Sequence, residues 1–361
     1  MKKDKMATLK SSTLKLYCWT GSFNSQPTTA QYTITKSNPD SNNTVRFEIS
    51  ELVQDYIDVT FDNNYNTINT TCWWYYVKTN QYTDLSTPTS TTEYGLATKG
   101  YTYFEDGLNS ILSTSKLFSN NYLYIPKNIQ YHIPIYKGPN GVKNVIYYTK
   151  DSTGVESVAD SKSISPITNV PGLETSDDFI VYVSSTIQAS KIEIVSTNTS
   201  VSTYNAQVGS ATETIYPIFT CDTKYTNHKV SFINKFGVIQ DIYFNKKRQD
   251  RLSVQKDNFV TSTIRSTTSS ATYDTFTPSN IVQDVASTKS ITLNTGFLRE
   301  EYNETIRQLL QSENIWIRED NKTLPILVKD SNFQYKTSVN DKLVNYTINF
   351  EFAFDGINNI R

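Results

Sequence analysis

The stretch Lys229–Phe244, KVSFINKFGVIQDIYF, decides how the rest of the chain is interpreted. The apolar residues Val230 and Phe232 indicate one strand, and the apolar run that begins at Val238 indicates a second. Between them lies the segment NKFG at 234–237, in which the glycine can adopt a positive φ. The stretch therefore predicts a β-hairpin at the centre of a sheet, and we expect it to close the first of two domains.

The composition favours a mainly β fold. The 361 residues include 25 Tyr and 17 Phe but only 12 Gly, and aromatic residues favour half-buried sheet surfaces. The chain is too long for one small core. We therefore expect a β-sandwich-like region over residues 1–248, which a polar loop at 149–178 could divide into two subdomains, and a smaller α+β domain, a sheet with one helix, over residues 249–361.

The second domain should combine a polar arm, one helix and a closing sheet. Residues 261–280 are rich in Ser and Thr and predict the arm. Tyr302, Ile306 and Leu309 recur at helical spacing, which predicts a helix over about residues 298–311. The last strand, near residues 343–354, alternates apolar and polar residues and should bury one face.

Charge and cysteine usage place few constraints on partners. The chain has 34 Lys and Arg against 35 Asp and Glu, so its net charge gives no reason to expect attraction to nucleic acid or membranes. Cys18, Cys72 and Cys221 lack metal-ligand spacing and are interpreted as buried thiols. No signal-peptide pattern and no apolar run of about 20 residues is present, so we expect neither export nor membrane insertion.

The sequence contains no catalytic motif. Its two histidines, His132 and His228, follow no nucleophile-elbow pattern and have no metal-ligand spacing with Cys or Asp. The acids Glu105 and Asp106 lie among aromatic residues and are the best candidates for a glycosidase pair, although solvated acids in a turn explain them as well. We expect no catalytic residue, no cofactor and no metal.

Two groups of residues are candidates for binding. Trp73, Trp74 and Tyr75 belong to the most aromatic strand and could contact a glycan or a partner, but adjacent strand residues point to opposite faces, so some of them must enter the core. The second group is a basic segment that could line a channel or contact DNA; Asp250 within it favours a solvated linker instead. The basic residues are Lys246, Lys247, Arg248 and Arg251.

The hairpin and the C-terminal region resemble tail hub or ring proteins of crAss-like bacteriophages that infect Bacteroides-type hosts. The segments that carry the resemblance are FINKFG at 232–237, LNTGF at 293–297 with the helix after it, YKT at 335–337 and NYTINFEFA at 345–353. The pattern covers about a third of the chain and includes no catalytic motif.

The resemblance implies a non-enzymatic virion protein of the phage tail. Such a subunit would form a homo-oligomeric ring around the DNA channel and join the connector to distal tail parts. Its partners would be copies of itself, other tail and connector proteins, and genomic DNA in transient contact. The alternatives are a glycan-binding or receptor-binding tail protein and a bacterial surface adhesin.

Overall fold

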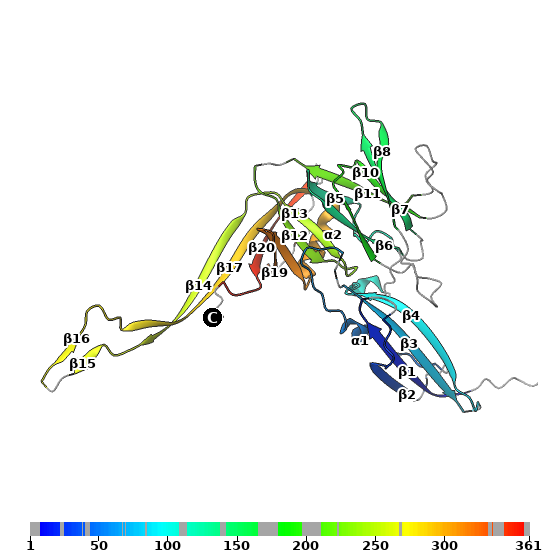
Figure 1. The fold of residues 1–361 in the computed structure, drawn as a ribbon, viewed down its shortest axis with the longest axis horizontal. Coiled ribbons are helices and arrows are strands. Elements are labelled where there is room, and N and C mark those ends of the chain that lie inside the picture. The colour runs from blue at the N-terminus through cyan, green and yellow to red at the C-terminus, as the bar shows by residue number, and fades with distance from the viewer. Residues whose placement is uncertain are drawn as a thin grey trace, which may run out of the picture. The chain divides into compact units, whose positions relative to one another are not determined.

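The computed structural model describes residues 8–21, 25–37, 39, 44–66, 68, 70–83, 85–107, 114–137, 142–164, 180–196, 211–221, 224–266, 269–330, 334 and 343–356. The expected mainly β fold is confirmed (Figure 1). The chain divides into two compact units. Unit 1 comprises Met1–Cys221, Ser231–Ile242 and Glu304–Ser312, and unit 2 comprises Asp222–Val230, Tyr243–Asn303 and Glu313–Arg361.

Neither unit is continuous in sequence. The expected domains met at residue 248, after the complete hairpin, whereas the compact units divide within both hairpin strands and again at the ends of the C-terminal helix. The difference arises because pattern reading assigns whole elements to consecutive domains, while packing can divide one hairpin between two units.

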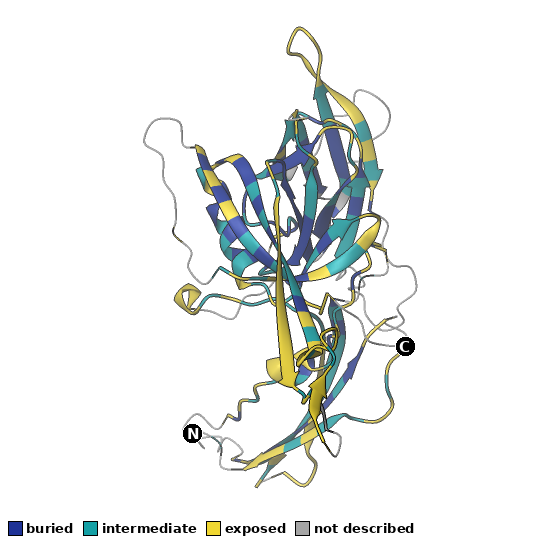
Figure 2. Cartoon of the chain, turned by 90° about the vertical axis from the view of Figure 1, so that its left-hand side faces the viewer, coloured by how far each residue is buried: buried dark blue, intermediate teal, exposed yellow. Residues whose placement is uncertain are grey.

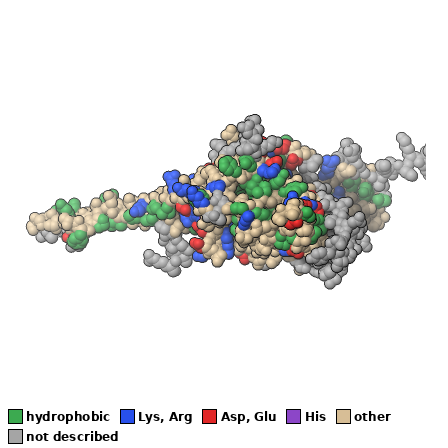
Figure 3. All heavy atoms as spheres, turned by 90° about the horizontal axis from the view of Figure 1, so that it is seen from above, with side chains coloured by type: hydrophobic (Ala, Val, Ile, Leu, Met, Phe, Trp, Pro, Cys, Tyr) green, Lys and Arg blue, Asp and Glu red, His purple; other side chains and the backbone are tan. Residues whose placement is uncertain are grey.

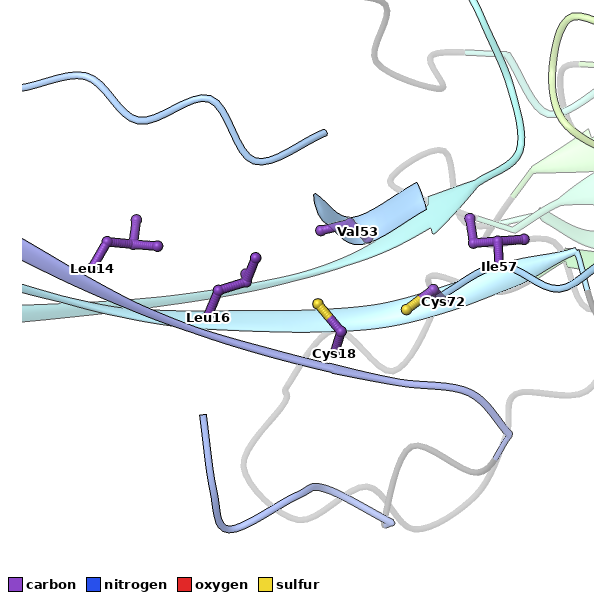
Figure 4. Packing of buried hydrophobic residues seen from close by; sticks show 6 residues of the cluster. All are labelled: Leu14, Leu16, Cys18, Val53, Ile57 and Cys72. Carbon is purple, nitrogen blue, oxygen red and sulfur yellow. The ribbon is translucent and has the colours of Figure 1, made fainter. Parts of the chain in front are cut away.

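The first sheet of unit 1 is antiparallel and has the strand order β2-β1-β3-β4. One of its faces packs against a short helix, α1. Leu14, Leu16 and Cys18 from β1 point to this face, as Figure 4 shows, and Val53 of α1 is buried against them. The elements are β1 (Leu9–Trp19), β2 (Tyr32–Ser37), α1 (Ser50–Gln54), β3 (Thr71–Tyr82) and β4 (Thr89–Thr98).

Two further sheets of unit 1 follow. A five-stranded sheet has the order β5-β11-β10-β7-β8, and β6 pairs with β9. A 3-10 turn, η1 (Phe104–Asp106), precedes them. The strands are β5 (Tyr122–Pro126), β6 (Tyr131–Tyr136), β7 (Val142–Lys150), β8 (Glu156–Ser163), β9 (Ile180–Ser185), β10 (Lys191–Ser196) and β11 (Ala211–Thr220).

The polar loop expected at 149–178 is partly wrong. Residues 156–163 form β8, which pairs antiparallel with β7 at the edge of the five-stranded sheet. This strand is polar because most of its side chains are exposed, so no buried face gives it an apolar alternation. Residues 165–179 lie outside the described part of the chain.

The seven-stranded sheet has the order β13-β12-β18-β19-β20-β17-β14. The predicted hairpin is present as β12 and β13, but it lies at one end of this sheet and not at its centre. Every residue of β13 is nevertheless buried, which explains why its sequence looks like that of a central strand. The strands are β12 (His228–Ile233), β13 (Ile239–Phe244), β14 (Gln249–Val260), β17 (Asn280–Arg299), β18 (Ile315–Glu319), β19 (Lys322–Val328) and β20 (Leu343–Phe352).

The turn of the β12–β13 hairpin has the geometry that its sequence predicts. Gly237 has a φ of 74°, and its amide donates to the Asn234 carbonyl at 2.9 Å. The Asn234 side-chain oxygen accepts a hydrogen bond from the Phe236 amide at 3.0 Å. The turn also contacts a distant part of unit 1, because the Tyr101 amide donates to the Lys235 carbonyl at 2.8 Å.

The predicted C-terminal helix is shorter than expected. It is α2 (Asn303–Gln311), preceded by a 3-10 turn, η2 (Glu300–Tyr302). Residues 298 and 299 belong to β17 instead, because they pair with the start of β20. The alternation predicted for the last strand is confirmed within β20, where Val344, Tyr346, Ile348, Phe350 and Phe352 are buried. The strand ends at Phe352, however, and Phe354, which was expected on the same face, is exposed.

Candidate functional site

A long β-hairpin is the feature of unit 2 that most resembles an interaction site. β14 and β17 pair antiparallel from Gln249 opposite Thr292 to Val260 opposite Asn280. The short strands β15 (Ile264–Ser266) and β16 (Ala271–Tyr273) pair at its tip. We call residues 249–290 the arm (Figure 1). The polar arm expected at 261–280 is therefore only the end of a longer hairpin.

Most of the arm is exposed, and the β17 residues near its base, such as Ser287, are buried or partly buried. All twelve residues of β14 are solvent-exposed, and Figure 2 shows this strand in the colour of exposed residues. Two strands alone bury little apolar surface, and an isolated two-stranded hairpin is marginally stable in water. Among the described residues, a third strand pairs with the arm only at its base, where Ser290 of β17 lies opposite Glu351 of β20.

Apolar side chains nevertheless lie on the arm. The pairing register places Leu252, Val254, Val260 and Val282 on one face of the hairpin, and Val260 is 79% exposed. The tip adds Ile264, Tyr273 and Phe276, the last of them 85% exposed. Figure 3 shows hydrophobic side chains distributed along the arm. Exposed apolar side chains gathered on one element are typical of an interaction surface.

The aromatic residues of the four-stranded sheet form a second candidate. Tyr17, Tyr75 and Tyr94 lie in one row across β1, β3 and β4, on the face opposite α1. The rings of Tyr17 and Tyr75 stack in parallel, with centroids 4.1 Å apart and planes 8° from each other. Trp73 lies in the next row, opposite Trp19. Stacking covers one face of each of the Tyr17 and Tyr75 rings, which leaves their other faces and Trp73 for contact with a sugar.

The three predicted contact residues do not share one surface. Trp73 and Tyr75 lie on the aromatic face, whereas Trp74 lies opposite Cys18 on the face that packs against α1. The Trp74 indole also covers Gly95 of β4, where an added Cβ would come within 2.5 Å of the ring. Trp74 is thus part of the packing of this sheet, and only Trp73 and Tyr75 remain candidates for contact.

We expect Trp74→Ala to lower the free energy of unfolding by about 2 kcal/mol, because it removes a large, partly buried ring. Tyr94→Ala, on the other face of the same sheet, should cost about 1 kcal/mol or less, because Tyr94 is 41% exposed. Urea denaturation followed by tryptophan fluorescence and circular dichroism measures both. Equal losses in the two variants would contradict the assignment of Trp74 to the packed face.

The predicted basic patch is not a set of four free cations. Arg248 forms ion pairs with Asp250 at 2.6 Å and with Glu319 at 2.7 Å, so its charge is compensated within unit 2. Arg251 is an exposed residue of β14. Lys247 is also exposed, whereas Lys246 is only partly so. The segment is not a linker between domains, because it lies within unit 2 and its residues 249–251 already belong to β14. A contact of this segment with DNA stays untested.

The candidate glycosidase acids have structural roles in unit 1. Arg307 lies over the ring of Tyr103, 3.7 Å from its centroid, and its guanidinium is 3.2 Å from the Glu105 carboxylate. Asp106 accepts a hydrogen bond from the Tyr103 amide at 3.2 Å and so caps the turn at 104–106. These contacts explain both acids as parts of a turn that is held against α2.

Both histidines of the chain lie in packed surroundings. The His132 ring stacks on Tyr65 at a centroid distance of 3.6 Å. His228 begins β12, where burial, together with the positive charge of Arg248, lowers its pKa. Both environments are those of packed side chains, and neither by itself indicates chemistry.

The expectation of three buried thiols is wrong for Cys221, which is exposed just after the end of β11. Cys18 and Cys72 are buried as expected. A hydrogen bond with Cys72, together with burial, raises the pKa of the Cys18 thiol well above its usual range. Cys18 therefore stays protonated, and a protonated buried thiol is unreactive.

A buried polar cluster in unit 1 was not predicted. The Asp241 carboxylate accepts hydrogen bonds at 2.6 Å from the Tyr65 hydroxyl and from the Ser231 hydroxyl. Nearby, the Tyr182 hydroxyl accepts a hydrogen bond from the Ile239 amide at 2.9 Å, and burial raises the Tyr182 pKa. The only signal in the sequence was a single acid, Asp241, inside an apolar strand.

No group of His, Cys, Asp or Glu side chains among the described residues is arranged to hold a metal ion. Within the same residues, no helix has the length and apolar character needed to cross a membrane. No protein-family model, curated protein or solved structure matches this chain. The geometry of the arm and of the aromatic face is therefore the basis for a functional proposal.

Proposed function

We propose that the chain is a non-enzymatic structural component of a bacteriophage tail. It assembles as a homo-oligomeric hub or ring around the DNA channel and joins the connector to distal tail parts. In the virion it contacts copies of itself and other tail and connector proteins, and DNA passes it in transient contact. The arm is the single observation that carries this proposal.

The arm supports an assembly role because, in a single chain, it leaves apolar side chains exposed that a partner could cover. Leu252, Val254 and Val260 are exposed, and covering each such side chain contributes roughly 1 to 2 kcal/mol. A ring of identical subunits offers a neighbour to every arm, since all subunits have the same environment. The near-balanced charge of the chain, 34 basic against 35 acidic residues, is compatible with a channel wall along which DNA slides.

Removing the arm should abolish incorporation into particles while leaving the fold intact. Val254 and Ser287 lie directly opposite each other, so residues 255–286 can be replaced by Asn-Gly, which forms a two-residue hairpin turn. Most of the removed side chains are exposed. The thermal unfolding midpoint of the purified chain should therefore change by no more than about 3 °C.

Incorporation is measured by supplying the tagged variant or the tagged full chain in infected cells and blotting purified particles for the tag. The full chain should enter particles and the shortened chain should not. Equal incorporation of both, with unchanged stability, would remove the arm as the assembly element.

The location of the chain is tested by immunogold electron microscopy of particles from the source culture. Gold at one vertex or along the tail is the expected result, and its distance from the capsid separates a connector from a distal component. Gold on cell envelopes, with unlabelled particles, would favour the surface adhesin instead.

A glycan-binding or receptor-binding tail protein is the second candidate. The observation in its favour is the row of aromatic residues on the outer face of the four-stranded sheet. Trp73 and Tyr75 lie on that face, so glycan-array binding that is lost in Trp73→Ala, with unchanged thermal stability, would support it. Trp74→Ala cannot serve for this test because Trp74 packs against the core.

A further inference from the structure

The free edge of β14 suggests how the arm is covered before the chain enters any larger assembly. β14 pairs with β17 and, within the described residues, with no other strand. Natural sheet edges are protected by short length, proline, a bulge or charged side chains. β14 carries four charged residues, so a second strand can pair with it only where these charges meet favourably. β14 has twelve residues and no proline. The hairpin contains one bulge, at Asp257–Asn258, but its extra residue, Gln283, belongs to β17 and not to β14. This edge is therefore open to a further strand.

Symmetry restricts how two copies of β14 can pair. In an antiparallel pair, directly opposite side chains lie on the same face of the sheet. A twofold axis must then pass between one residue and its own copy, so each symmetric register is defined by its central residue. Four of these registers bring two like charges face to face, which is destabilising; their central residues are Asp250, Arg251, Lys256 and Asp257.

Among the remaining registers, the one centred on Val254 has the best charge complementarity. It places Arg251 of each copy opposite Asp257 of the other. The register centred on Ser253 would instead pair Asp250 with Lys256, but Asp250 is already bound to Arg248 at 2.6 Å. Registers centred on Leu252 or Gln255 produce no pair of opposite charges within the strand.

The structure of a single arm contains an unfavourable charge pair that this register relieves. Asp257 lies directly opposite Asp284 within the hairpin, and two carboxylates in that position repel each other. Arg251 and Asp257 have no ion-pair partner among the described residues. In the register centred on Val254, Arg251 of the second copy lies beside Asp257 and completes a row of two acids and one base.

We propose that the free chain forms a twofold dimer in which the β14 edges of two copies pair antiparallel, with Val254 facing Val254. The two hairpins then make one four-stranded sheet, β17-β14-β14-β17, which is more stable than two separate hairpins. Leu252, Val254, Val260 and Val282 of both copies share one face of it. This inference goes beyond the tail assignment and does not depend on it.

The charge pair is tested by sedimentation velocity of the full chain. The native chain should be dimeric. Arg251→Asp should weaken the dimer about tenfold or more, because it replaces two attractive contacts by two repulsive ones. The double variant Arg251→Asp/Asp257→Arg should restore the dimer, since the charges are only exchanged. A monomeric native chain, or a dimer that Arg251→Asp leaves unchanged, would overturn the proposal.

The register is tested by cysteine cross-linking in a Cys221→Ser background, because Cys18 and Cys72 are buried. Under mild oxidation with diamide, Val254→Cys should give a disulfide-linked dimer on a non-reducing gel, because the two thiols face each other. Ser253→Cys, whose side chain faces Gln255 of the second copy, should give much less. A stronger cross-link at 253 than at 254 would overturn the proposed pairing. Failure of both tests would leave the particle experiments on the tail assignment unaffected.

Discussion

Replacing Gly237 by alanine should destabilise unit 1 by about 3 to 5 kcal/mol, one of the two largest effects that we expect from a single substitution. Gly237 has a φ of 74°, which costs an L-residue about 1 kcal/mol. In addition, an added Cβ would lie 2.4 Å from the Gly100 amide nitrogen and 2.6 Å from that of Lys99. These are backbone atoms and cannot rotate away, so the hairpin turn must separate from residues 99–101.

The matched control is Gly107→Ala. Gly107 also has a positive φ, 67°, but an added Cβ there meets no atom of the described residues within 4 Å. We expect a loss of about 1 kcal/mol from conformational strain alone. Guanidinium chloride denaturation of both variants measures the difference. Similar losses at the two positions would mean that the close approach of the turn to Gly100 contributes nothing to stability.

The comparison of these two glycines illustrates what the sequence could predict. The NKFG segment predicted a turn and a positive φ at Gly237, because that preference is local. The requirement for a missing side chain comes from Lys99 and Gly100, which are far away in the sequence and belong to another segment of unit 1. No local pattern contains this information.

The strands that the sequence did not predict have one property in common. β4, β8 and β14 are each largely exposed, so they have no buried face to produce an apolar alternation. β20 was predicted correctly because its even-numbered residues are buried and its odd-numbered residues largely are not. Pattern reading therefore finds strands that border a core and misses strands that extend into solvent.

This limitation bears directly on the candidate site. The sequence predicted an arm at 261–280 from its Ser and Thr content but gave no reason to extend it to residue 249, because β14 is exposed on both faces. The aromatic strand was predicted more fully. Strand periodicity required Trp74 to oppose Trp73 and Tyr75, but only the register with β1 shows that Cys18 and the core lie on the Trp74 side.

The second large effect concerns the buried acid of β13. Asp241→Ala should destabilise unit 1 by about 3 kcal/mol or more, because two buried hydroxyl groups then lose their acceptor. The Tyr65 and Ser231 hydroxyls both donate to this carboxylate at 2.6 Å. Asp241→Asn should cost less, about 1 to 2 kcal/mol, because the amide oxygen remains as an acceptor. Thermal and urea denaturation measure both losses.

A double-mutant cycle with Tyr65→Phe separates the hydrogen bond from packing. Phenylalanine keeps the ring that stacks on His132 at 3.6 Å, so Tyr65→Phe removes only the hydroxyl. It should cost about 2 kcal/mol, because a buried carboxylate then loses a donor. In Tyr65→Phe/Asp241→Ala the loss should be smaller than the sum of the single losses by at least about 1 kcal/mol. Strict additivity would show that Tyr65 and Asp241 do not stabilise each other. Asp241, a polar residue in an apolar strand, would then call for a role other than stability.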